Sequence, residues 1–256
     1  MYQNSFYITD QIGNNALSYN ERINKKIFVP SLKKIESFNQ IQLTPNPSLD
    51  NRGEQDDHKI VFEDYDFDDI LQSCTWLENF YEMSWKWKPL YLFDNHNHAY
   101  YFFYLARQQW YITDGATLFH VDEHADMRDP WEPYLMKPDS LDIQKVFEYT
   151  NLSKVNVWNY IIPAQKEWLI GDIIQIRNET NLLDYESGSC NIYSENIILN
   201  LDLDFFNPEL DFIDYDLKKK VVLDMAQRAN FITVATSPFF IDQQLAIKVF
   251  KDIFST

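Results

Sequence analysis

Glycine and cysteine are both scarce in this sequence. It has 5 glycines in 256 residues, and neither GxGxxG nor GxxxxGK(S/T) occurs. Loops that hold nucleotide phosphates need such glycine patterns, so we exclude both kinds of phosphate loop. The 2 cysteines, Cys74 and Cys190, form no Cys-x-x-Cys pair. A disulfide framework is therefore excluded, and we expect a soluble protein of a reducing, cytoplasmic compartment.

Long apolar runs and positive charge are also lacking. No window approaches the roughly 20 apolar residues that cross a bilayer. The start of the chain has no basic stretch followed by an apolar one, so we expect no signal peptide. Lys and Arg number 22 against 39 Asp and Glu, a formal net charge of −17. Such a chain repels nucleic acid and anionic membranes, and it attracts metal cations and basic peptides.

The sequence has enough apolar residues, 45%, to build a core. Short apolar runs alternate with helical patterns from about residue 59 onward, which is typical of a mostly parallel sheet covered on both faces. We therefore predict an α/β fold, a three-layer αβα sandwich, as a single domain over 1–256. Residues 1–58 are a divergent segment and a candidate for peptide recognition, and 42–57 are predicted to be a surface loop. Strands are expected at 59–64, 89–93, 116–122, 171–178, 195–204 and 231–237, and helices at 67–80, 98–109, 140–150, 153–162, 213–229 and 241–254.

Aspartate and histidine gather where three of the predicted strands end. The three segments are 94–98 (DNHNH), 120–126 (HVDEHAD) and 200–204 (NLDLD). Ligands of open α/β sheets bind beyond the carboxyl ends of the strands. Residues spaced by two on an extended chain point to one side, so the carboxylates of each segment should converge. Their mutual repulsion raises their pKa values, and divalent cations relieve it.

These donors suit particular metals. Carboxylates with imidazoles favour Mn²⁺ and, less selectively, Fe²⁺, Co²⁺ or Zn²⁺. Two of the segments have a plainer interpretation on their own: Asp202 and Asp204 as turn residues, and His96 and His98 as packing residues at a helix start. The segment 120–126 favours a metal even alone. All three segments in one chain favour a metal site.

The motifs resemble those of a known group. DEHAD (122–126) and LDLD (201–204) resemble the DxHxD and DxD metal motifs of the arginase/agmatinase (ureohydrolase) superfamily, and PLYLFDNHNHA (89–99) matches, without a gap, the segment with its first metal histidine. The likeness extends to a divergent branch, the peptide arginases of ribosomally made natural products. Their HxDxHxD motif corresponds to 120–126, and their Ser-Pro strand end to Ser237-Pro238. The resemblance covers about residues 85–245.

The resemblance implies an arginase/deacetylase-like fold with two Mn²⁺ ions per chain. The implied reaction is hydrolysis of peptidyl arginine to ornithine, with release of urea, in an arginine-containing precursor peptide. Asp126 and His120 are the candidate catalytic residues, Asp126 as a proton carrier and His120 as a support for a ligand. The implied metal ligands are His96 and Asp126 for one ion, His124 and Asp204 for the other, and Asp122 and Asp202 as bridges.

The sequence departs from the family pattern in places. The family's Gly-Gly pair is Phe93-Asp94 here, and its guanidinium-binding glutamate falls near Ala235. Asp242 is a candidate replacement, although it also suits a helix N-cap. His98 is an alternative first histidine that is expected to point beside His96.

Three other functions stay open at this point. They are a small-molecule ureohydrolase acting on agmatine, guanidinobutyrate or free arginine, a zinc deacetylase, and a non-catalytic metal- or peptide-binding protein. The sequence lacks the His-His pair that deacetylases use.

Overall fold

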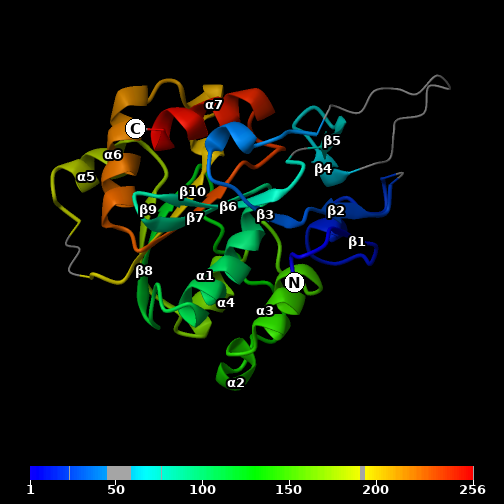
Figure 1. Ribbon diagram of the computed structural model, residues 1–256. Helices are drawn as coiled ribbons and strands as arrows, with labels where there is room; N and C mark the ends of the chain where they lie inside the picture. Colours follow the sequence, from blue (N-terminus) through cyan, green and yellow to red (C-terminus); the bar gives the residue numbers. More distant parts are fainter. Residues whose placement is uncertain (23, 45–58, 76, 191–193, 256) are drawn as a thin grey trace.

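The computed structural model describes residues 1–22, 24–44, 59–75, 77–190 and 194–255. These residues form a mixed α/β structure in which helices cover both faces of a mostly parallel sheet (Figure 1). The predicted three-layer αβα sandwich is therefore confirmed.

The central sheet determines where the polar strand ends meet. Within the described ranges it has seven strands, in the order β3-β6-β7-β11-β10-β8-β9. All neighbours from β7 to β9 are parallel, and β6 runs antiparallel to β7. The central strands β8 and β10 are buried on both faces, which explains their nearly continuous apolar sequences. The bounds are β3 (Leu32–Lys34), β6 (Phe80–Trp85), β7 (Lys88–Phe93), β8 (Ala116–Val121), β9 (Ile170–Ile176), β10 (Ile197–Asp202) and β11 (Phe231–Ala235).

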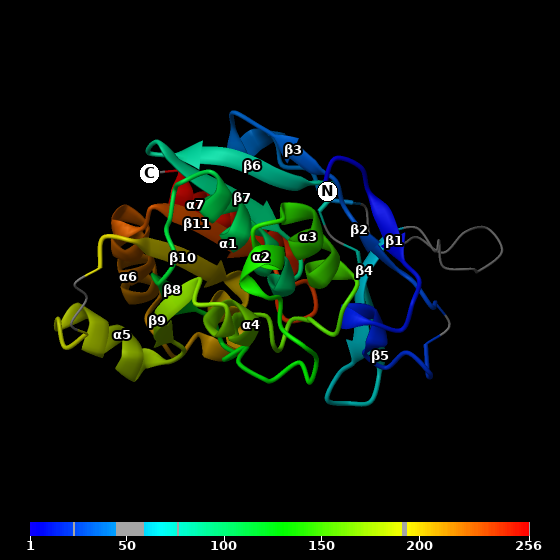
Figure 2. The ribbon, with the colours of Figure 1, turned by 90° about the horizontal axis from the view of Figure 1, so that it is seen from below.

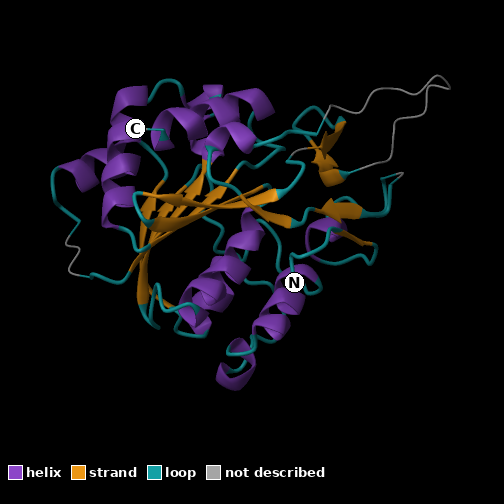
Figure 3. Cartoon of the chain, in the orientation of Figure 1, coloured by secondary structure: helices purple, strands orange, loops and turns teal. Residues whose placement is uncertain are grey.

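Helices form the two outer layers (Figure 3). The first layer contains α5 (Glu179–Glu186), α6 (Tyr215–Arg228) and α7 (Gln243–Phe254), and the second contains α1 (Ala99–Gln108), α2 (Lys137–Ser140), α3 (Ile143–Asn151) and α4 (Ile161–Lys166). Helix α7 buries residues spaced by three and four, among them Ala246, Phe250 and Phe254, and this spacing gives a helix one apolar face. No helix among the described residues has the length and apolar character needed to cross a bilayer.

Two small antiparallel sheets lie beside the main one (Figure 2). The ion pair between Arg22 Nη1 and Glu63 Oε2, 3.5 Å apart and buried, joins the amino-terminal segment to one of them. The strands are β1 (Phe6–Ile8) with β2 (Ile27–Val29), and β4 (Ile60–Tyr65) with β5 (Leu71–Thr75). Short 3₁₀ helices complete the chain: η1 (Gly13–Ala16), η2 (Phe38–Gln40), η3 (His96–His98), η4 (Leu203–Phe206) and η5 (Pro208–Leu210).

The helix predicted at 67–80 is wrong, since this segment contains β5 and the start of β6. The acidic residues that suggested a first helical turn form a hairpin turn instead. Asp66 Oδ1 accepts hydrogen bonds from the backbone N–H groups of Asp68 and Ile70, at 3.0 and 2.9 Å. Asp69 has a left-handed φ of 56°. Such side-chain bonds compete with helix formation, and pairing with β4 then fixes the strand.

The helix predicted at 153–162 is wrong over its first part, because α4 begins only at Ile161. Ser153 Oγ, Asn156 Oδ1 and Asn159 Oδ1 accept hydrogen bonds from nearby backbone N–H groups, which holds this stretch in turns. Helices α2 and α5 and strands β1 to β3 and β6 were not predicted. Most of the predicted 42–57 loop lies outside the described residues.

Candidate metal centre

The carboxyl ends of four parallel strands lie at one level of the sheet. Asp202 pairs with Ala235 on the neighbouring strand, and Ala235 pairs with Phe93. On the other side of β10, Leu201 pairs with Val121. The segments that follow β7, β8, β10 and β11 therefore leave the sheet side by side, and their polar side chains meet.

His96 lies at the centre of this meeting point, and its side chain is 1% exposed. Its Nδ1 atom is 2.9 Å from Asp122 Oδ2, 3.2 Å from Asp126 Oδ2 and 3.0 Å from Asp202 Oδ2. Among the described residues, His96 Nδ1 nevertheless has no partner with hydrogen-bond geometry, and the same is true of Asp122 Oδ2. Three carboxylates around one buried nitrogen are the surroundings of a cation, so these residues fit a bound metal ion.

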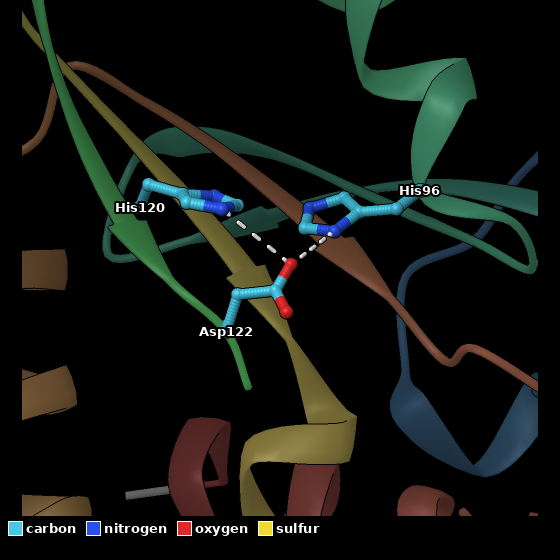
Figure 4. Close-up of side chains that lie close together, drawn as sticks. All are labelled: His96, His120 and Asp122. Carbon is cyan, nitrogen blue, oxygen red and sulfur yellow. Dashed lines mark ion pairs between the residues drawn. The ribbon is translucent and has the colours of Figure 1, made fainter. Parts of the chain in front are cut away.

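A second group of ligand atoms shares Asp122 with the first. His124 Nδ1 is 2.9 Å from Asp204 Oδ2 and 3.4 Å from Asp122 Oδ1. Asp122 thus directs one oxygen toward His96 and the other toward His124. Two triplets could hold metal ions, with their ligand atoms within 4.8 Å of one another: His96, His120 and Asp122, drawn in Figure 4, and Asp122, His124 and Asp204.

Asn200, a residue of β10, orients two of the imidazole rings through its side-chain amide. Its Oδ1 accepts a hydrogen bond from His96 Nε2 at 3.0 Å, and Thr233 Oγ1 donates to the same oxygen at 2.8 Å. Its Nδ2 donates to His120 Nδ1, also at 3.0 Å. With Nε2 of His96 as the donor, Nδ1 is the atom that faces the carboxylates. In the neutral ring this atom has the lone pair that binds a metal. The Nε2–H of His120 then faces Asp122 Oδ2, at 3.5 Å, so in this tautomer His120 supports Asp122 and does not itself bind the ion.

The pKa values reflect carboxylates and imidazoles packed together in a buried site. Burial acts to lower the pKa of His96, but Asp202 and Asp122 outweigh it and raise that pKa well above its ordinary value. Burial, assisted by the charge of Asp122, raises the pKa of Asp126 to about 7. Burial lowers the pKa of His120 to about 4, so this ring is neutral at pH 7. Groups with raised pKa values, such as His96 and Asp126, keep their protons at neutral pH. These protons offset the negative charge that a bound metal cation would otherwise offset.

Two residues of the site have left-handed backbones. Asp126 has a φ of 51° and Ser237 a φ of 44°. Ser237 Oγ donates a hydrogen bond to Asp202 Oδ2, the oxygen that faces His96. Left-handed conformations are uncommon outside glycine and cluster at functional sites, where the surrounding structure maintains them. Here the strained backbone of Asp126 directs its own carboxylate, and that of Ser237 places the hydroxyl that binds Asp202.

An aromatic wall adjoins the second triplet. The His124 ring lies 4.6 Å from the ring of Phe240 and 5.3 Å from that of Trp158, measured between centroids. Phe240 and Trp158 also contact each other in an edge arrangement, at 5.5 Å. A planar cation such as a guanidinium stacks favourably on such faces.

The structure brings together His120 and all six predicted ligands, His96, Asp122, His124, Asp126, Asp202 and Asp204. The expectation that His98 points beside His96 is wrong. Its Nδ1 is 2.7 Å from the hydroxyl of Tyr2, because its ring packs into the aromatic core under β7. Asp242 caps α7 by accepting from the N–H groups of Gln244 and Leu245, as its alternative interpretation states.

Sequence reasoning assigned no role to Asn200, Ser237 or the Trp158–Phe240 wall. For Asn200 a signal existed: it precedes Asp202 by two residues in a strand and therefore faces the same side. Ser237 stood out only through the Ser-Pro resemblance. Trp158 lies in the segment that was predicted to be a helix, and its position beside His124 depends on tertiary contacts.

No family model matches the chain, and the search of the curated proteins also finds no match. Function is therefore inferred from the side chains of the site and their chemistry.

Proposed function

We propose that the protein is a metal-dependent hydrolase that removes urea from arginine side chains of a peptide and leaves ornithine. The observation that carries the proposal is the position of His96 Nδ1, within 3.2 Å of three carboxylate oxygens at the carboxyl edge of the sheet. The DxHxD and DxD spacing supports the choice of a ureohydrolase among metal-dependent hydrolases.

The side chains fit two divalent cations, for which Mn²⁺ is our choice. His96 and Asp126 would hold one ion, His124 and Asp204 would hold the other, and Asp122 and Asp202 would contact both. Two ions bound here would supply a Lewis acid that makes water nucleophilic near neutral pH.

The remaining steps belong to side chains of the chain itself. The carboxylates around His96 favour a positively charged substrate group, as does the formal net charge of −17. Phe240 and Trp158 offer aromatic faces against which a guanidinium can be oriented. Asp126, whose Oδ2 lies 3.2 Å from His96 Nδ1, would accept a proton from the attacking water and pass it to the leaving amine.

Mass spectrometry of peptides tests the proposal. The purified protein, loaded with Mn²⁺, is incubated with arginine-containing peptides, free arginine and agmatine. We expect loss of CH₂N₂ from the peptides and an equal amount of urea, with little turnover of the small compounds. Asp202→Asn should lose both bound metal and urea release. Asp216→Asn, a matched change at an exposed position of α6, should keep both.

Two results would refute the proposal. One is undiminished urea release by the Asp202→Asn variant. The other is a metal-loaded protein that releases urea from none of the guanidino compounds. If only agmatine or free arginine releases urea, the protein is still a hydrolase, but peptides are not its substrate.

A further inference from the structure

A groove of about 700 Å³ lies beside the candidate metal centre. This volume lies within the range of sites that bury a drug-sized ligand, and it exceeds what one arginine needs. Its walls come from three parts of the chain that are distant in sequence: the segment around η1, the loop that follows Asp126, and the turns before α4. The residues used below are Ile12, Gly13, Arg128, Asp129, Trp131 and Trp158.

Trp158 connects the groove to the metal centre. Its indole lines the groove and also contacts the ring of His124. Arg128 lies two residues after Asp126, and its backbone N–H donates to the carbonyl of Trp158 at 3.0 Å. A chain that lies in the groove therefore reaches the metal centre at its Trp158 end.

The groove is preformed by specific contacts of the amino-terminal segment. Gly13 has a φ of 52°, and a Cβ at this position would lie 2.9 Å from the carbonyl oxygen of Val155. The buried Asn14 donates from Nδ2 to Asn97 Oδ1 at 2.9 Å and accepts at Oδ1 from the N–H of Val157 at 3.0 Å. The segment is thus fixed both to η3, which carries His96, and to the loop that carries Trp158. Such a preformed site does not have to be ordered when its ligand binds, which lowers the entropic cost of binding.

The side chains of the groove indicate what it binds. Trp131 is 83% exposed and offers an apolar face. The Arg128 guanidinium lies 5.1 Å from the centroid of the Trp158 ring. The ion pairs that Lys and Arg form with carboxylates in the described part of the chain all involve other residues. The carboxylate of the neighbouring Asp129 is hydrogen-bonded elsewhere: its two oxygens accept from the N–H of Trp131 and from the hydroxyl of Tyr134. An unpaired arginine in so acidic a protein suits a carboxylate of the ligand.

We propose that this groove binds the residues that flank the reacting arginine of a peptide, with an apolar or aromatic side chain against Trp131 and an acidic side chain at Arg128. The position of the reacting arginine rests on the proposed function. Occupation of the groove does not, because it needs neither metal nor catalysis.

Binding to the metal-free protein tests the inference separately from catalysis. The probe is a fluorescein-labelled seven-residue peptide with phenylalanine and glutamate beside a central arginine, measured by fluorescence anisotropy. Its matched counterpart carries glutamine in place of the glutamate. Trp131→Ala should raise the Kd of the probe about tenfold. Arg128→Gln should raise it for the glutamate peptide and leave the glutamine peptide nearly unchanged.

Trp110→Ala is the matched control. Trp110 is 85% exposed like Trp131, but it follows α1 near the amino-terminal end of β8, at the other edge of the sheet. Equal Kd values for wild type, Trp131→Ala and Arg128→Gln would overturn the inference, and so would a loss in Trp110→Ala as large as that in Trp131→Ala.

The two proposals can fail independently. If Trp131→Ala binds the probe more weakly but no peptide releases urea, peptide binding in the groove is supported and the hydrolase proposal is refuted. Urea release from peptides, together with Kd values that are the same for wild type, Trp131→Ala and Arg128→Gln, would support the hydrolase and contradict peptide binding in the groove.

Discussion

His96 donates a hydrogen bond from Nε2 to Oδ1 of Asn200, and this bond turns the opposite ring nitrogen toward three carboxylates. The same amide holds His120 through Nδ2. One residue of β10 therefore sets the tautomers of two rings that come from β8 and η3. Partners of this kind orient metal ligands and raise metal affinity without touching the ion.

Replacing Asn200 by alanine should weaken Mn²⁺ binding about 10- to 100-fold, because neither ring keeps its tautomer and orientation. Isothermal titration calorimetry with Mn²⁺ measures the loss. Asn20→Ala, a change at an exposed position, provides the control. An unchanged Mn²⁺ affinity in Asn200→Ala would contradict the role assigned to this amide.

Ser237→Gly separates the hydroxyl of this residue from its backbone. Glycine adopts the left-handed φ of 44° without strain, so the variant removes only the hydrogen bond to Asp202. We expect Mn²⁺ affinity to fall about tenfold. The free energy of unfolding of the metal-free protein should fall by no more than about 1–3 kcal/mol, because relief of the left-handed strain partly offsets the lost hydrogen bond. Both quantities follow from titration calorimetry and urea denaturation, and a large loss of stability at full affinity would speak against the proposed role.

Much of the fold could be predicted because its central elements are determined locally. The buried strands β8 and β10 appear as short apolar runs, and α6 and α7 show a helical period, so neighbours along the chain suffice. The segment 67–80 failed because its acidic residues suit a helix start as well as a turn. Pairing of β5 with β4 decides between the two, and no local pattern reports that pairing.

The candidate site was predictable where spacing by two reveals it. Asp122, His124 and Asp126 follow one strand, and Asp202 and Asp204 follow its neighbour. The position of His98 in the aromatic core was not predictable, because Tyr2 and Phe80, distant in sequence, form its surroundings. The groove at η1 likewise depends on tertiary contacts, such as those of Asn14, that leave no periodic trace.

Asp94 should make the metal-free protein less stable as the pH rises. Its carboxyl is fully buried, and burial raises its pKa from 3.8 to about 7. The neighbouring His98 gives no compensating charge, since burial lowers its pKa to about 3. A carboxyl with a raised folded pKa favours the protonated folded state. Its contribution to stability is therefore present below about pH 4 and is lost as the pH rises through about 7.

Asp94→Asn removes this titration. Relative to wild type, the variant should gain on the order of 3 kcal/mol between about pH 5 and about pH 8. Urea denaturation in the presence of a chelator at both pH values measures the difference. The pKa of Asp126 is also raised, but this group titrates in both proteins, so its contribution cancels in the difference between variant and wild type. Parallel stability profiles for wild type and variant would show that Asp94 is not the group responsible.

Gly13 and Gly188 form a natural pair for measuring how tightly the groove is built. Both have left-handed φ angles, 52° and 75°, so alanine costs backbone strain of about 1 kcal/mol at either position. Only at Gly13 would the new Cβ meet the backbone, 2.9 Å from Val155 O, whereas nothing lies within 4 Å at Gly188. Gly13→Ala should therefore lower the free energy of unfolding by about 1–3 kcal/mol more than Gly188→Ala, as overpacking does. Urea denaturation of both variants gives this difference directly. Equal losses would mean that the η1 segment moves away from Val155 easily, and the wall of the groove would then be adaptable rather than preformed.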